Sequence, residues 1–139
     1  MFTIQVKVGR FLECRILELR STQELEALKT EARRVLDSTP GKVVACVDYR
    51  SLHLLHSEIA SGWLQFLADA NPKIERGAAL ISGEHAISRL QISRIVREAR
   101  LSLRRVFDDV EALEDWLGQL LTPSERARLH EFIHEPAHG

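Results

Sequence analysis

The sequence lacks the long apolar runs and the cysteine spacings that mark membrane and secreted proteins. No apolar run approaches the roughly 20 residues that a membrane-spanning helix requires. The chain alternates in polarity from Phe2 onward, so neither a transmembrane segment nor a signal peptide is expected. The 2 cysteines, Cys14 and Cys46, lie in separate strand-like runs without a CxxC partner or a nearby histidine. We therefore expect buried, reduced thiols and a cytoplasmic location.

Glycine clusters and net charge are also missing where particular functions would need them. The 7 glycines are scattered, and none falls in a GxGxxG or P-loop array that cradles phosphate, so neither a nucleotide nor any other cofactor is expected. The formal net charge of -1 gives no global attraction to nucleic acid or membranes. What the chain does have is the 45% hydrophobic and 28% charged composition of an ordinary globular domain.

Hydrophobic periodicity predicts an N-terminal hairpin followed by strands that alternate with helices. Residues 2–8 alternate apolar and polar side chains, Gly9-Arg10 is a turn candidate, and residues 11–19 form a second, antiparallel strand. Ser21 is the expected N-cap of the first helix, with Glu24 as its capping-box partner. Further along, the patterns predict a central strand over 43–48, helices over 57–70, around 92–99 and over 110–120, strands over 78–81 and 101–107, and a last helix that begins at Thr122-Pro123-Ser124-Glu125.

The predicted order is ββαβαβαβα with an added short C-terminal helix. Strands that alternate with helices predict parallel crossovers, so the fold class is α/β with a mixed five-stranded sheet and packed helices. We expect residues 1–121 to form this domain and residues 122–139 to form a C-terminal helical extension.

Four short motifs accompany this order. They are Val47-Asp48 at a strand end, Trp63 in the second helix, Val106-Phe107-Asp108 at a later strand end, and Trp116-Leu117 in the next helix. Together with the element order, over residues 11–120, they resemble the STAS domains, the family of anti-sigma factor antagonists such as SpoIIAA. The resemblance implies a SpoIIAA-like fold, which is also compared with CRAL-TRIO lipid-binding domains. It also implies a non-enzymatic module that binds a regulatory protein partner through the turn after the third strand.

That turn departs from the pattern of the antagonists. In that family it reads Asp-Ser-Ser-Gly and its second serine is phosphorylated, whereas the matching residues here are His56-Ser57-Glu58-Ile59. Glu58 replaces the phosphorylated serine, and it either favours the helix dipole or imitates a phosphoserine. Ser57 is the candidate phosphosite, and it also fits the N-cap of the helix. We predict a constitutive protein contact rather than a phospho-switch, made by His53, His56, Ser57 and Glu58.

A second hypothesis is a carrier or sensor of an apolar or lipid-like ligand that associates peripherally with a membrane. The pocket would be lined by large apolar side chains of the second and third helices, although the same helical spacing is typical of plain core. These side chains are Trp63, Phe66, Leu67 and Ile92.

Arginines of the third helix are predicted to lie on the side opposite Ile92 and to form a basic stripe. The stripe either meets an anionic partner such as lipid headgroups or remains a solvated helix face. No aromatic residue is interleaved with these arginines, so nucleic acid is not an expected partner. The sequence also leaves open whether the chain forms a homo-oligomer. The arginines are Arg89, Arg94, Arg97 and Arg100.

Two histidine patterns suggest chemistry that the rest of the chain does not support. His130–His134 is a literal HExxH, with Glu131 as the would-be general base, but a catalytic zinc needs a third protein ligand and only His138 follows. No dedicated metal site is therefore predicted, and adventitious binding by these histidines stays open. A hydrolase that uses His56 and Ser57 is the least favoured hypothesis, because no glycine-rich oxyanion loop accompanies them.

Overall fold

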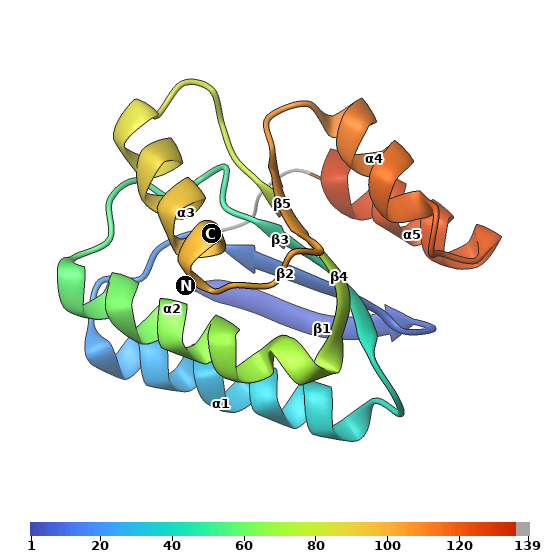
Figure 1. Ribbon diagram of the computed structural model, residues 1–139, viewed down its shortest axis with the longest axis horizontal. Helices are drawn as coiled ribbons and strands as arrows, with labels where there is room; N and C mark the ends of the chain where they lie inside the picture. Colours follow the sequence, from blue (N-terminus) through green and yellow to red (C-terminus); the bar gives the residue numbers. More distant parts are fainter. Residues whose placement is uncertain (136–139) are drawn as a thin grey trace.

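The chain folds around a mixed five-stranded sheet, and the computed structural model describes residues 1–135. β1 pairs antiparallel with β2, and the later neighbours are all parallel, so the strands lie side by side in chain order (Figure 1). The predicted fold class is confirmed. The elements are β1 (Phe2–Val8), β2 (Phe11–Ile16), α1 (Thr22–Ser38), β3 (Val43–Asp48), α2 (Ser57–Ala70), the 3-10 turn η1 (Asn71–Lys73), β4 (Ile74–Leu80), α3 (Ala86–Glu98), β5 (Arg104–Phe107), α4 (Val110–Gly118) and α5 (Pro123–His134).

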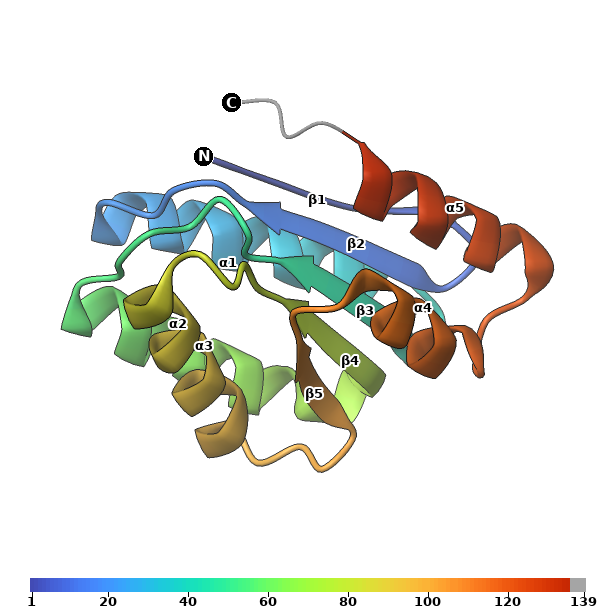
Figure 2. The same ribbon diagram turned by 90° about the horizontal axis from the view of Figure 1, so that it is seen from above.

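Helices cover both faces of the sheet (Figures 1 and 2). α1, α2 and α3 pack on one face, called here the α1–α3 face, where Val43 and Ala45 of β3 are buried. α4 and α5 pack on the other, the α4–α5 face, where Val44 and Cys46 are buried. Successive strand residues point to opposite faces, so a strand covered on both sides must be apolar throughout. This explains the continuous apolar pattern of β3.

The hairpin turn lies where the sequence predicts it, at Gly9-Arg10. Gly9 has a φ of 58°, a conformation that costs glycine little. The carboxylate of Glu125, at the start of α5, contacts Gly9 so closely that a Cβ there would collide with it. The same carboxylate accepts a hydrogen bond of 2.7 Å from the Arg10 backbone N–H. The tip of the hairpin is therefore joined to the start of the last helix.

Three strand boundaries differ from the sequence-based ranges. β2 ends at Ile16 rather than at residue 19, because the N–H groups of Leu17 and Glu18 turn to the Met1 carbonyl. β4 begins at Ile74 rather than at residue 78, and its first residues pair with β3 despite their polar character. β5 begins at Arg104 rather than at residue 101, because a tight turn joins Leu101 to Arg104.

The predicted N-termini of α1 and α5 are both capped, with one difference at α1. The Ser21 hydroxyl accepts the Glu24 N–H at 3.1 Å, so Ser21 caps α1. The Glu24 carboxylate, however, accepts from the Arg20 N–H (3.0 Å) and the N-terminal ammonium group (2.9 Å) rather than from the backbone of Ser21. At α5, Thr122 and Glu125 form the full reciprocal capping box.

The α4–α5 face buries charged side chains as well as apolar ones. β2 turns Glu13 and Arg15 toward α5, and both are less than a tenth exposed. Arg128 of α5 donates to the Glu13 carboxylate at 2.7 and 2.5 Å, and Arg15 donates to Asp48 at 3.0 Å. Each of these four charges thus has an opposite charge within hydrogen-bonding distance, which offsets the cost of its burial.

Two arginines also satisfy the C-terminal end of α5. Arg15 donates to the Phe132 carbonyl at 2.6 Å, and Arg50 donates to the Ile133 carbonyl at 2.7 Å. The last carbonyls of a helix have no N–H partners inside the helix, so these guanidinium groups donate the missing hydrogen bonds. Burial alone would raise the pKa of Asp48, but hydrogen bonds from Arg50 and Arg15 outweigh it and hold this pKa below its usual range. The network therefore holds the end of α5 in place and keeps Asp48 ionised at neutral pH.

The two thiols are buried and free, as predicted. Burial raises the pKa of Cys14 to about 12 and raises that of Cys46 further. Both side chains therefore behave as small apolar core residues at neutral pH. Among residues 1–135, no helix combines the length and the apolar character needed to span a bilayer.

Candidate partner-binding edge

The chain that follows β3 is held against α3 with two of its side chains directed outward. Leu52 and Leu55 are buried at 3% and 2% exposure, whereas His53 and Leu54 between them are exposed. Gln91 of α3 donates to the Leu55 carbonyl at 2.6 Å and accepts the Leu55 N–H at 2.9 Å. The buried leucines and these hydrogen bonds fix the backbone of the segment. The exposure of His53 and Leu54 is therefore set by the fold of the turn.

The predicted contact residues lie together at the entry to α2, and all of them are exposed. One detail of the prediction is wrong. His56 and not Ser57 is the N-cap, because its carbonyl accepts the first helical bond, from the Ala60 N–H at 2.9 Å. Ser57 is the first residue of the helix, and Glu58 lies in its first turn beside the positive end of the helix dipole.

Large apolar side chains that the sequence analysis did not single out lie at the same edge. Leu54, Ile87 and Leu90 are 60%, 68% and 71% exposed. Leu54 and Ile87 line one hollow of about 260 Å³, and the rings of His53 and His85 meet beside it with centroids 4.7 Å apart. Ile87 and Leu90 are neighbours on the surface of α3, because residues three apart share a helix face. The signal was available in the sequence, since both positions lie opposite Ile92 at 100° per residue.

The outward side of α3 is apolar at its start and basic toward its end. Ile87, Leu90, Arg94 and Arg97 recur at spacings of three, four and three residues, which places them along one exposed line. A partner that lies along this line meets apolar side chains first and guanidinium groups afterwards.

Two members of the predicted arginine stripe do not belong to that line. Arg100 lies beyond the end of α3 with a φ of 61°, so helical spacing does not place it beside the others. Arg89 lies toward β5 and forms an ion pair with Asp108 at 3.1 Å. The stripe on the helix itself therefore consists of Arg94 and Arg97.

A groove lined by residues of α2 and α3 continues this edge, where the two helices lie side by side (Figure 2). It has a volume of about 260 Å³, and both Ser57 and Arg94 line it. Glu98 also lines it and pairs with Arg94 at 3.1 Å across one turn of the helix. The predicted contact residues, the exposed apolar side chains and the two arginines are grouped here under one name, the α2–α3 edge. It consists of His53, Leu54, His56, Ser57, Glu58, His85, Ile87, Leu90, Arg94 and Arg97.

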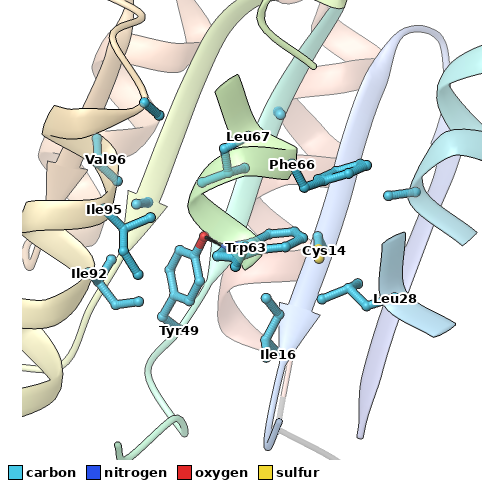
Figure 3. Packing of buried hydrophobic residues seen from close by; sticks show 14 of the residues in the cluster. Cys14, Ile16, Leu28, Tyr49, Trp63, Phe66, Leu67, Ile92, Ile95 and Val96 are labelled. Carbon is cyan, nitrogen blue, oxygen red and sulfur yellow. Dashed lines mark hydrogen bonds between the residues drawn. The ribbon is translucent and has the colours of Figure 1, made fainter. Parts of the chain in front are cut away.

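The residues predicted to hold an apolar ligand are packed in the core (Figure 3). Trp63 stacks on Phe66 with ring centroids 5.4 Å apart and donates from Nε1 to the Tyr49 hydroxyl at 2.9 Å. Trp63, Phe66 and Leu67 line a cavity of about 50 Å³, and Ile92 packs in the same core without lining it. Pockets that hold drug-sized ligands measure roughly 300–1,000 Å³. This cavity is far too small for a lipid-like molecule.

The two histidine patterns also have defined places. Within residues 1–135 the Ser57 hydroxyl makes no hydrogen bond to His53 or His56. His130 and His134 lie on α5, which both views place away from α2 and α3 (Figures 1 and 2). His138 lies outside the described residues.

Comparison with known proteins identifies the architecture. No protein-family model and no curated protein matches the chain. Among solved structures it is similar to an uncharacterised protein of the DUF3478 family with a SpoIIAA-like fold, from Shewanella loihica PV-4. The TM-score is 0.63 at 19% identity, and the match covers 84% of this chain and 93% of that one. The chain therefore has the SpoIIAA-like fold that the sequence motifs predicted, and at this identity the likeness establishes the fold alone.

Proposed function

We propose that the protein is a non-enzymatic binding module that holds a protein partner at the α2–α3 edge. The observation that carries the proposal is the grouping of Leu54, Ile87 and Leu90, each more than half exposed, beside the predicted contact residues. A single exposed leucine needs no explanation, whereas grouped apolar side chains with a polar rim are typical of interaction sites. The fold is consistent with such a role.

The order of side chains along α3 indicates the chemistry of the partner. Ile87 and Leu90 favour apolar side chains, and Arg94 and Arg97 favour carboxylates about one to two helical turns further along. A partner segment that presents apolar residues followed by acidic ones complements this surface. The contact is constitutive, because Glu58 supplies a permanent negative charge at the start of α2.

Affinity capture from a lysate of the source cells tests the proposal. Wild type is compared with Ile87→Ser/Leu90→Ser and with His56→Ala/Glu58→Lys, and proteins that only wild type retains are identified by mass spectrometry. Leu103→Ser is the matched control, because Leu103 is 44% exposed but lies beyond the C-terminal end of α3. Purified partner should then bind wild type and Leu103→Ser equally, and bind the edge variants at least about tenfold more weakly. Equal binding by all variants would exclude this surface.

Two further variants separate the chemical contributions. Arg94→Ala/Arg97→Ala should weaken the binding and reduce its dependence on salt, because rim charges act mainly through long-range attraction. Ser57→Ala should keep full binding if the contact is constitutive. A loss of partner binding in this variant would instead favour regulation by phosphorylation of Ser57. Light scattering on the same proteins shows whether the partner is a second copy, in which case wild type is a dimer and Ile87→Ser/Leu90→Ser a monomer.

The apolar-ligand hypothesis has no comparable support. The cavity beside Trp63 measures about 50 Å³, and a ligand carrier would have to separate α2 from the sheet to enlarge it. Native mass spectrometry of freshly purified protein should therefore find the mass of the bare chain.

A further inference from the structure

The two histidines of the HExxH sequence meet a carboxylate from a different helix. His130 and His134 are one turn apart on α5, with ring centroids 4.3 Å apart. The Glu114 carboxylate of α4 lies against both rings, with Oε1 at 2.7 Å from His130 Nδ1 and Oε2 at 3.7 Å from His134 Nε2. One ligand atom from each of the three residues falls within 4.8 Å of the other two.

This arrangement supplies the third ligand that the sequence analysis could not find. Glu114 lies upstream of both histidines, on the preceding helix, and is brought close to them only by the packing of α4 on α5. Two imidazoles and one carboxylate are a common donor set for zinc. In a tetrahedral site with bonds of about 2.0–2.1 Å the ligand atoms are roughly 3.3 Å apart, so small side-chain rotations suffice here.

The exposure of the three side chains suits a binding site that is open to solvent. The His130 and His134 side chains are 65% and 49% exposed, and Glu114 is 22% exposed, so the imidazoles can reorient while the carboxylate is held. A catalytic zinc site would in addition need a base and a sheltered cleft. Glu131, the would-be base, instead contacts Arg128 at 3.3 Å and is 66% exposed.

We propose that Glu114, His130 and His134 form a binding site for a late first-row transition-metal dication, which joins α4 to α5. Imidazole ligands favour Zn²⁺, Ni²⁺ or Cu²⁺ over Mg²⁺ and Ca²⁺, which take oxygen ligands. The ion replaces the hydrogen bond between His130 and Glu114 with coordinate bonds from both helices. It therefore stabilises the layer that covers the α4–α5 face without taking part in a reaction.

Calorimetric titration of the full chain, prepared without a histidine tag, with ZnCl₂ tests the site. We expect one ion per chain, no heat from MgCl₂, and a loss of affinity of at least about tenfold in His130→Ala, His134→Ala and Glu114→Gln. His53→Ala/His85→Ala is the matched control, because it removes another close pair of histidine rings and should bind zinc like wild type. Wild-type affinity in Glu114→Gln or in His130→Ala/His134→Ala would overturn the proposal, as would the absence of binding.

Thermal unfolding provides a second readout of the same site. Ligands that bind only the folded state raise its stability, so saturating Zn²⁺ should raise the Tm of wild type by roughly 5 °C or more. The three site variants should fold with unchanged circular dichroism, since the two histidines lie at the surface and Glu114→Gln keeps the size of the side chain, and they should lose this rise. A zinc-dependent rise of the same size in Glu114→Gln would exclude a site that bridges the two helices.

Discussion

The two faces of the sheet are covered by helices in different ways. On the α1–α3 face the buried cluster is apolar, and its largest side chains are stacked aromatic rings, with Trp63 on Phe66 (Figure 3). On the α4–α5 face an apolar cluster around Phe132 is combined with two buried ion pairs: Arg128 of α5 pairs with Glu13 of β2, and Arg15 of β2 pairs with Asp48 of β3. The α1–α3 layer is held mainly by contact area, which has no direction, with single hydrogen bonds such as that from Trp63 to Tyr49. The α4–α5 layer is held in addition by buried ion pairs that require one particular position.

This difference explains how α5 is placed. An apolar helix face can slide over a sheet with a small loss of contact area, whereas Arg128 reaches the buried Glu13 from only one register. At the two ends of the helix, Glu125 bonds to the hairpin and the Phe132 carbonyl bonds to Arg15. Buried ion pairs add little net stability because both charges lose their hydration. We infer that on this face they act instead by selecting a single position for the last helix.

The largest expected effect on stability concerns the α1–α3 face. Trp63→Ala removes a side chain that is 2% exposed, together with its stacking on Phe66 and its bond to Tyr49. We expect a loss of about 3–5 kcal/mol in the free energy of unfolding, measured by urea denaturation and followed by circular dichroism. Trp63→Phe is the control, because it keeps an aromatic ring at this position. A loss below about 1 kcal/mol in Trp63→Ala would mean that this ring does not hold the layer.

On the α4–α5 face, a single and a double substitution should change the free energy of unfolding by very different amounts. Arg128→Met leaves the Glu13 carboxylate buried at 3% exposure without a partner and should cost about 3 kcal/mol. Glu13→Leu/Arg128→Met removes both charges and should recover most of that loss. Urea denaturation of the two variants measures the difference. If the double variant were as unstable as the single one, the ion pair itself would be a main source of stability.

Acid should remove the stabilising contribution of Asp48 on the α4–α5 face. The pKa of Asp48 is lowered in the folded chain by hydrogen bonds from Arg50 and Arg15 that outweigh burial. A carboxyl group with a depressed pKa contributes its stability above the unfolded pKa of about 4, and that contribution is lost as pH falls through the folded pKa. Asp48→Asn should therefore be less stable than wild type at pH 7, and the gap should narrow toward pH 2. A gap that is independent of pH would contradict this reasoning.

The same comparison explains which features the sequence could reveal. α2 matches its predicted bounds, and β3 its predicted place, because helical spacing and continuous apolar runs are local signals. The burial of Glu13 and Arg15 is not local, since their partners include a residue 115 positions away and a helix end. The contact between Glu114 and His130 across two helices was hidden for the same reason. At the α2–α3 edge the predicted residues stay a prediction, and the structure adds the exposed apolar side chains beside them.

The smallest expected effect lies on the outer side of the α1–α3 layer. Ile87→Ser/Leu90→Ser changes two side chains that are 68% and 71% exposed, so the free energy of unfolding should change by no more than about 0.5 kcal/mol. Ile92→Ser, on the inner side of the same helix with 0% exposure, should lose several times as much, because it leaves a cavity and buries a hydroxyl group. Urea denaturation of both proteins measures the contrast. If the outer variant were strongly destabilised, Ile87 and Leu90 would contribute to the stability of the fold. Their exposure would then no longer indicate a binding site. An unchanged stability leaves binding as the reason for two large apolar side chains in water.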